Sequence, residues 1–232
     1  MYDWVTNMHA HLGGECQHKC SYCYVDTPRW GRAERYTGEL RLIEDEFKVK
    51  YDEKTLCRNE GKYPGVIFIE HMNDLFAESI PDEFIVRILE HCKKFPENTY
   101  VFQTKNPARY SKFLHLIPTN SILGTTIETN RDMSEVSKAP SAKDRYEAMK
   151  ILNFRKFLTC EPLLDFDVEV LAKWISEIKP EFLNLGADSK GNNLVEPTYS
   201  KILLLVAELK KYNIEVREKH NIQRLIDKEK IC

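Results

Sequence analysis

The sequence predicts an α/β fold in which helices cover a parallel sheet that closes fully or partly into a barrel. Short apolar segments of strand length alternate with amphipathic segments of helix length along most of the chain. The strand candidates are almost continuously apolar, which is typical of parallel strands buried on both faces. Six or seven such units favour a barrel over a flat doubly wound sheet. A glycine-rich phosphate loop after a strand, typical of the Rossmann fold, is absent from the sequence.

Six strands are predicted from short runs of aliphatic and aromatic residues bounded by Pro, Gly or Asn. They are Trp4–Met8, Val66–Glu70, Thr99–Gln103, Ile122–Ile127, Lys156–Cys160 and Phe182–Gly186. A weaker seventh candidate is Ile214–Arg217.

Helices are predicted between these strands. Asp82–Lys94 has an apolar stripe that includes Phe84, Ile85 and Ile88, and Pro81 directly precedes it. The other helices are Pro107–Leu116, Ala142–Leu152, Val168–Ile178 and Pro197–Tyr212. Residues 24–63 are the least regular part of the chain. We expect some of them to form helix or cover, because a bare loop of that length is unusual in a compact domain.

Length and composition indicate one domain of an ordinary globular protein. We expect a single domain over residues 1–232, with a core at about 4–190 and C-terminal helices with an extra strand at 191–232. The sequence lacks an apolar run of about 18 residues and a secretory signal, so we expect a cytoplasmic protein with no membrane partner. The net charge of −2 disfavours a protein that coats nucleic acid through bulk electrostatics.

Polar residues follow the predicted strands. In an α/β barrel the carboxyl ends of the strands lie on one rim, so we expect these side chains to line a polar pocket there. They include Glu70, Asp74, Gln103, Lys105, Thr126, Glu128, Glu161 and Asp188. Asp, Asn and Ser also stabilise ordinary turns. Because Glu and Lys are not turn formers, Glu70, Lys105, Glu128 and Glu161 are the stronger candidates, and they indicate a polar ligand.

Three cysteines lie within eight residues, with the spacing C-x3-C-x2-C. They are Cys16, Cys20 and Cys23, and Tyr22 stands directly before the last. Three thiolates on one loop can hold three irons of a cubane cluster and leave the fourth iron open to a ligand. A cluster that serves only electron transfer is normally held by four cysteines. The loop therefore favours a catalytic iron–sulfur cluster.

Zinc is the alternative metal. Cys20 and Cys23 would form one pair of ligands, and the second pair would be Cys16 with His9, His11 or His18. The total of seven cysteines is odd, and four of them are scattered, which argues against a disulfide scaffold. We expect these four, Cys57, Cys92, Cys160 and Cys232, to be inert thiols.

The cysteine loop resembles the signature of radical S-adenosylmethionine (radical SAM) enzymes. Further segments resemble, in order, one branch of that superfamily that is frequent in phages and mobile elements. They are residues 72–76 with 80–82, 102–109, 123–128, 160–164 and 184–187, so the resemblance covers roughly residues 4–190. The Cys-Tyr-Cys-Tyr core and the turn at residues 103–105 are also similar to spore photoproduct lyase, a DNA-repair member of the superfamily.

The resemblance implies a partial (β/α)6 TIM-like barrel and two cofactors, a 4Fe-4S cluster and S-adenosyl-L-methionine. Cys16, Cys20 and Cys23 would ligate the cluster, and the amine and carboxylate of S-adenosyl-L-methionine would chelate the open iron. The candidates to hold the amino and ribose groups of that cofactor are Asp74, Thr126 and Glu128. Tyr22 would lie near the adenine or pack over the cluster.

The resemblance also implies a reaction. An external donor, flavodoxin- or ferredoxin-like, would reduce the cluster, and cleavage of S-adenosyl-L-methionine would yield a 5′-deoxyadenosyl radical that abstracts hydrogen from a substrate. The expected catalytic contacts are Lys105, Gln103 and Glu161, and Lys105 suits a carboxylate or phosphate as a point charge.

The substrate class is indicated only by arginines interleaved with aromatic residues at 29–36, which can meet phosphates and bases. If these residues contact a ligand, that ligand is a nucleic acid or nucleotide. The acidic residues nearby favour the other interpretation, in which the segment is a solvated charged cover. Two alternative functions stay open: a zinc-stabilised, non-catalytic binding or regulatory module, and a radical SAM enzyme acting on a peptide.

Overall fold

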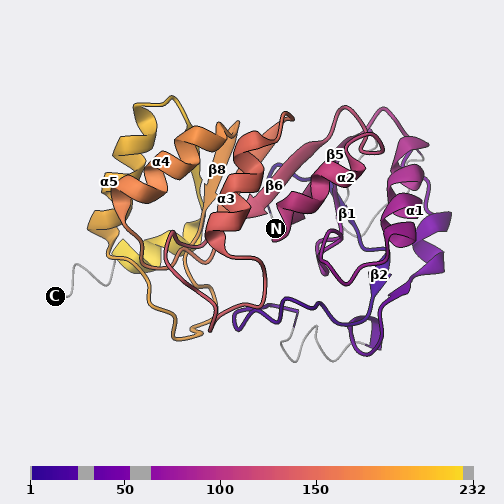
Figure 1. Ribbon diagram of the computed structural model, residues 1–232, viewed down its shortest axis with the longest axis horizontal. Helices are drawn as coiled ribbons and strands as arrows, with labels where there is room; N and C mark the ends of the chain where they lie inside the picture. The colour runs from indigo at the N-terminus through magenta and orange to yellow at the C-terminus, as the bar shows by residue number, and fades with distance from the viewer. Residues whose placement is uncertain (1, 26–33, 53–63, 227–232) are drawn as a thin grey trace. The chain divides into compact units, whose positions relative to one another are not determined.

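The computed structural model describes residues 2–25, 34–52 and 64–226 (Figure 1). Contacts divide the chain into two compact units. The first comprises Met1–His18 and Cys23–Leu123, and the second comprises Lys19–Tyr22 and Gly124–Cys232. The expectation of a single domain over residues 1–232 stays a prediction.

The first unit is built on parallel strands. β1 (Asn7–His9) pairs with β4 (Val66–Ile69), and β4 pairs with β5 (Thr99–Thr104). Helix α1 (Asp82–Lys93) connects β4 to β5, and its apolar stripe is buried. Because Pro81 has no N–H to leave unsatisfied, it suits the start of this helix. The predicted β4–α1–β5 succession is confirmed to within one residue at each boundary.

The first strand begins later than the predicted Trp4–Met8. The N–H of Val5 donates to the carbonyl of Tyr2 at 3.1 Å, so residues 2–5 form a turn. Pairing begins where the N–H of Thr6 donates to the carbonyl of Val66 at 2.9 Å. The apolar pattern alone does not distinguish this turn from a strand, since both can carry aromatic residues. In the turn, the rings of Tyr2 and Trp4 stack with their centroids 5.3 Å apart.

Short elements cover the first unit between β1 and β4. β2 (Leu12–Gly13) pairs antiparallel with β3 (Arg41–Leu42), and two 3-10 helices, η1 (Glu34–Tyr36) and η2 (Glu44–Lys48), lie beside them in sequence. Gly14 follows β2 with a φ of +90°, and a Cβ there would come within 2.8 Å of the Leu40 Cα. Glycine is therefore required at the point where the chain enters the cysteine loop.

The helix after β5 is shorter than the predicted Pro107–Leu116. The chain forms a 3-10 turn, η3 (Pro107–Arg109), and then the single helical turn α2 (Tyr110–Phe113). The N–H groups of Leu116 and Ile117 both donate to the carbonyl of Phe113, so the helix ends in a tight turn. Pro118 follows and disfavours helical backbone at the residue before it.

The second unit repeats the strand–helix alternation. Its strands β7 (Lys156–Cys160), β8 (Phe182–Leu185) and β9 (Glu215–Glu218) are parallel neighbours. β6 (Ile122–Thr126) carries the chain from the first unit into the second. The described strands have the sheet order β1-β4-β5-β6-β7-β8-β9, with β1 and β9 as its edges. The α/β class and the open, partial form of the predicted barrel are confirmed, and so is the weaker seventh strand.

Helices α3 (Ala142–Ile151), α4 (Val168–Ile178) and α5 (Tyr199–Lys210) belong to the second unit, and α4 and α5 lie side by side (Figure 1). α5 begins two residues after the predicted Pro197, because the side chain of Thr198 caps it by accepting from the N–H of Lys201. None of the described helices has the length and apolar character that crossing a bilayer requires.

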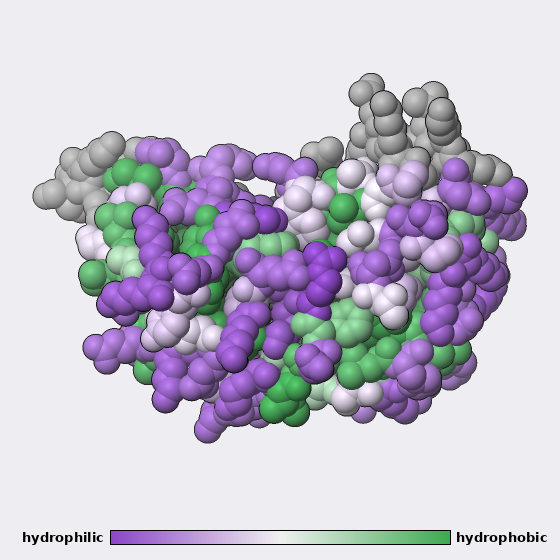
Figure 2. Space-filling view, turned by 90° about the horizontal axis from the view of Figure 1, so that it is seen from above, coloured by the Kyte–Doolittle hydropathy of each residue, from purple (hydrophilic) through white to green (hydrophobic). Residues whose placement is uncertain are grey.

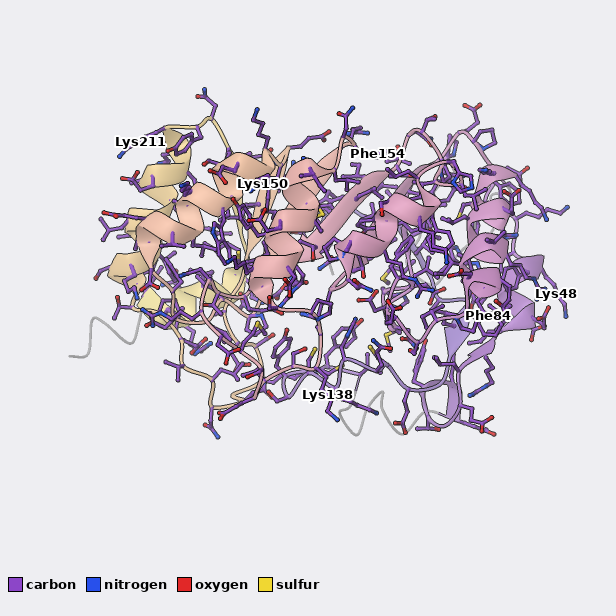
Figure 3. The ribbon with its side chains drawn as sticks, viewed as in Figure 1. Lys48, Phe84, Lys138, Lys150, Phe154 and Lys211 are labelled. Carbon is purple, nitrogen blue, oxygen red and sulfur yellow. The ribbon has the colours of Figure 1, made fainter. Side chains whose placement is uncertain are left out.

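The visible surface mixes hydrophilic and hydrophobic residues (Figure 2). Three of the lysines labelled in Figure 3 illustrate how charges are balanced locally, because each of the three pairs with a carboxylate three positions earlier in the chain. These pairs are Lys48 with Asp45, Lys150 with Glu147 and Lys211 with Glu208. Exposed pairs of this kind add little stability, but they neutralise the lysines locally.

Candidate functional site

The three cysteines of the loop differ from the other described cysteines. Cys16, Cys20 and Cys23 are thiols outside any disulfide and partly exposed, whereas Cys92 and Cys160 are thiols that are buried. Burial raises the pKa of the Cys92 and Cys160 thiols, which keeps them protonated and unreactive. The prediction that these two cysteines are inert thiols is therefore supported. Cys57 and Cys232 lie outside the described residues.

The donor chemistry of the loop fits a cluster held by three thiolates, because it offers three reduced and partly accessible thiols. Within residues 2–25, 34–52 and 64–226, no three His, Cys, Asp or Glu side chains are already gathered as a metal site. The histidines that zinc would require are each paired with a carboxylate. The pairs are His9 with Glu46, His11 with Glu70 and His18 with Asp74. A carboxylate on one ring nitrogen is usual for a histidine that binds metal through the other, so these pairs are compatible with the zinc alternative as well.

In the first unit, Cys23 packs against a small apolar cluster formed by Ala10, Val25 and Met72. Ala10 directly follows β1, and Met72 follows β4 by three residues. The carboxyl ends of two neighbouring parallel strands therefore hold this cysteine, as the barrel prediction requires.

In the second unit, Cys20 lies beside the segment that follows β6. Its Sγ is 3.1 Å from the Oγ of Ser137, and the N–H of Ser21 donates to the carbonyl of Val136 at 2.8 Å. These two contacts hold Cys20 and its neighbour Ser21 against the segment at residues 136–137.

Tyr22 and Glu128 are joined in the second unit. The Tyr22 hydroxyl donates to Glu128 Oε1, and Arg145 Nη1 lies 2.9 Å from Glu128 Oε2. Arg145 also donates to the carbonyl of Thr126 at 2.6 Å, so one guanidinium holds both predicted cofactor-binding residues at the end of β6. Glu128 is fully buried.

The phenol of Tyr22 remains protonated. Burial raises its pKa well above the ordinary value, and the neighbouring Glu128 and Cys20 raise it further. The hydroxyl therefore acts as a hydrogen-bond donor to Glu128 rather than as a base.

In the first unit, Asp74 and Lys105 are brought together through the backbone of Lys105. The Lys105 N–H donates to Asp74 Oδ2 at 2.7 Å, and His18 Nε2 lies 2.8 Å from the same oxygen. The predicted catalytic residue Gln103 points to a different partner, because its Oε1 accepts from the hydroxyl of Tyr2 at 2.9 Å.

Glu161 is paired across the end of β8 in the second unit. Lys219 Nζ lies 2.8 and 2.7 Å from the two carboxylate oxygens of Glu161. Gly186 lies beside this side chain, and a Cβ at that position would come within 2.9 Å of the Glu161 Cγ. The small residue at the end of β8 thus makes room for the ion pair. Both charged side chains keep part of their surface exposed.

Glu70, which the sequence also marks as a candidate, is an internal residue. Its carboxylate accepts from the N–H groups of His11 and Leu12 at 2.5 and 3.2 Å and from the His11 ring at 3.1 Å. It is buried and has a φ of +61°. Glu70 therefore holds the chain that follows β1 against the end of β4.

The predicted arginine-rich stretch is only partly described, since residues 29–33 lie outside the described ranges. Arg35 donates to Glu46 and to the carbonyl of Ala10, and Arg41 donates to four backbone carbonyls of its own loop. These contacts support the interpretation of a charged cover.

Sequence reasoning did not predict the role of three residues that hold the candidate site: His18, which it named only as a possible zinc ligand, Arg145 and Lys219. Each contributes one long-range polar contact to a predicted residue, namely Asp74, Glu128 or Glu161. His18 carries a signal, because it lies between two of the cysteines. Arg145 and Lys219 look like ordinary charged residues of a helix and a strand end.

Solved structures share this fold. A spore photoproduct lyase mutant with bound AdoMet and dinucleoside spore photoproduct has a TM-score of 0.56 at 14% identity, covering 87% of this chain and 60% of that chain. SuiB from Streptococcus suis, bound to S-adenosylmethionine, has a TM-score of 0.63 at 11% identity, covering 93% of this chain and 51% of that chain. A second spore photoproduct lyase mutant has a TM-score of 0.62 at 10% identity, covering 90% of this chain and 74% of that chain.

The chain thus spans little more than half the length of the first two of these structures. At such low identity the likeness establishes the fold, and the predicted radical SAM type of fold is confirmed at that level. No curated protein matches the chain.

A family model matches the part of the chain that contains the cysteine loop and continues to the end of α4. Residues 4–178 match the family described as "Protein of unknown function (DUF5131)". Because this match covers well over half of the chain, the protein belongs to the DUF5131 family.

Proposed function

We propose that this protein is a radical SAM enzyme of the branch frequent in phages and mobile elements. Cys16, Cys20 and Cys23 would hold a 4Fe-4S cluster, and an external flavodoxin- or ferredoxin-like donor would reduce it. When bound, the cluster and S-adenosyl-L-methionine would supply one-electron chemistry for hydrogen abstraction. The observation that carries the proposal is the set of three reduced, partly exposed thiols at the C-x3-C-x2-C spacing, on a fold shared with two structures that hold S-adenosylmethionine.

The residues at the end of β6 would position the cofactor. Arg145 neutralises the buried carboxylate of Glu128 and fixes its orientation, and Tyr22 donates to its other oxygen. A carboxylate held in this way is a fixed acceptor for hydroxyl or ammonium groups. Thr126 lies two residues earlier, with its backbone carbonyl bound to the same arginine. We therefore assign these residues to the ribose or amino group of S-adenosyl-L-methionine.

The residues assigned to the substrate are polar. Glu161 presents a carboxylate and Lys219 an ammonium at the carboxyl ends of β7 and β9, and Gln103 presents an amide near the end of β5. We propose a nucleotide or nucleic-acid substrate, because a paired acceptor and donor suit the hydrogen-bonding edge of a base. The dinucleoside bound to a spore photoproduct lyase of this fold supports the same class.

Metal content tests the proposal. The protein is purified without oxygen and reconstituted with iron and sulfide, and iron, sulfide and zinc are measured per chain. We expect a brown protein that retains about four irons, the number in a cubane cluster. Substituting Cys16, Cys20 and Cys23 by alanine is expected to abolish iron binding, whereas Cys92→Ala is a matched control that retains it. A colourless protein with one tightly bound zinc would favour the binding-module alternative.

A further inference from the structure

The segment that follows β4 docks the first part of the cysteine loop. Three hydrogen bonds connect residues 73–79 to residues on both sides of Cys16. They are Asn73 Nδ2 to the carbonyl of Gly14 at 3.2 Å, His18 Nε2 to Asp74 Oδ2 at 2.8 Å, and the N–H of Ser79 to Gln17 Oε1 at 2.6 Å. This part of the loop is therefore held from outside the loop, and all the partners belong to the first unit.

The bond between His18 and Asp74 is the one among the three that involves a carboxylate. Their side chains are 2% and 9% exposed. An ionised carboxylate can only accept, so the proton of this bond lies on His18 Nε2. Shielding from solvent strengthens a hydrogen bond to a charged group, and leaving such a group unpaired is costly. This bond is therefore expected to contribute more to docking than the other two.

Asp74 is itself held by the ends of two strands. Its Oδ1 accepts from the N–H of Phe76 at 3.0 Å, and its Oδ2 accepts from the N–H of Lys105 at 2.7 Å. Burial raises the pKa of Asp74, but the bonds from His18, Thr104 and Lys105 outweigh burial and bring it below the ordinary value. The carboxylate is thus ionised at neutral pH and fixed in orientation.

We propose that His18 and Asp74 are positioning residues for the cysteine loop, so that the ends of β4 and β5 set the place of Cys16 for metal binding. This inference rests on the proposed function and deepens it. It gives Asp74 a role in shaping the cluster site, because its Oδ2 joins His18 of the loop to the N–H of Lys105 at the end of β5. His18 acts through the loop backbone and takes no part as a ligand.

The experiment compares three variants of the reconstituted protein. His18→Leu removes the donor, His18→Gln keeps an amide nitrogen at the same reach, and His91→Leu removes a buried histidine that bonds the carbonyl of Val49, away from the loop. Release of iron to an excess of chelator is timed, and the urea midpoint of each metal-free chain is recorded.

Outer partners of a metal site typically contribute 10–100-fold in metal affinity, so we expect His18→Leu to release iron about tenfold faster than the wild type. His18→Gln is expected to restore most of the difference. His91→Leu is expected to lower the urea midpoint without changing iron release. Equal release from His18→Leu and the wild type, or from His18→Leu and His91→Leu, would overturn the proposal.

A readout without metal separates this inference from the proposed function. In the metal-free chain, the rate of alkylation by N-ethylmaleimide is measured for each cysteine. His18→Leu is expected to speed alkylation of Cys16 about tenfold, the factor for one lost hydrogen bond to a charged group, and to leave Cys92 unchanged. An unchanged Cys16 rate would refute the positioning role. If the wild type binds no iron, and Cys16 is still alkylated faster in His18→Leu than in the wild type, the proposed function alone is refuted.

Discussion

Arg145 and Glu128 form a buried ion pair in which Nη1 lies 2.9 Å from Oε2, with side chains only 1% and 0% exposed. Arg145 comes from α3, and Glu128 follows β6 by two residues. Removing two charges from water is costly, so a pair of this kind adds little net stability over an apolar pair. Its consequence is a fixed orientation of the Glu128 carboxylate beside Thr126 and Tyr22.

Arg145→Met is expected to destabilise the fold by about 3–5 kcal/mol, because it leaves a buried carboxylate without its partner. Urea unfolding measures the difference. The matched control is Arg155→Met, since Arg155 pairs with Glu181 in an exposed position, where the expected loss is about 0–1 kcal/mol. Similar losses in the two variants would show that the buried pair has no special role.

Gly124→Ala is expected to destabilise the second unit by about 1–3 kcal/mol through overpacking. Gly124 lies in β6, and a Cβ at this position would clash with the ring of Phe157 on β7. Phe157→Leu removes the ring that the Cβ would meet. Gly124→Ala is therefore expected to cost less stability in the Phe157→Leu background than in the wild type. Additive losses in this cycle would contradict the steric explanation.

Glu70→Ala is expected to cost about 2–6 kcal/mol, since it leaves the N–H groups of His11 and Leu12 buried without an acceptor, at about 1–3 kcal/mol each. Glu70→Gln keeps one acceptor oxygen and is expected to lose less. The free energy of unfolding is compared with that of Glu83→Ala, an exposed position on α1. If Glu70→Ala were as stable as Glu83→Ala, the internal role of Glu70 would be wrong.

His91 is expected to make the fold less stable as the pH falls from about 6.5 to 4. Burial and, to a smaller extent, the nearby His11 lower the pKa of His91 to about 4. In this window the unfolded chain binds a proton that the folded chain does not, so stability falls with pH by up to about 1.4 kcal/mol per unit. His91→Gln is expected to flatten this part of the curve. Parallel curves for both proteins between pH 6.5 and 4 would contradict the assignment.

Most strands could be predicted because apolar runs of strand length are bounded by Gly, Pro or Asn. β7 and α4 agree with their predicted ranges at both ends. The prediction was wrong where local chemistry competes with the apolar pattern. Residues 2–5 form a turn closed by a backbone hydrogen bond, and Thr198 caps α5 and so moves its start away from Pro197.

The candidate site was predictable where the signal is local and not where it depends on a distant partner. The spacing of Cys16, Cys20 and Cys23 is visible in the sequence, and the rule that strand ends carry functional residues locates Glu128 and Glu161. The same rule selects Glu70, which is occupied by backbone N–H groups. Arg145 and Lys219 become visible only when folding brings them to residues 17 and 58 positions away.

Formation of 5′-deoxyadenosine distinguishes a radical SAM enzyme from a zinc-binding module. The protein, reconstituted without oxygen, is incubated with S-adenosyl-L-methionine and dithionite, alone and with a dinucleotide, DNA or RNA. We predict 5′-deoxyadenosine from the wild type and Cys92→Ala, more of it with the true substrate, and none from variants lacking Cys16, Cys20 or Cys23. A protein that binds zinc in place of iron and forms no 5′-deoxyadenosine in any arm would contradict the account.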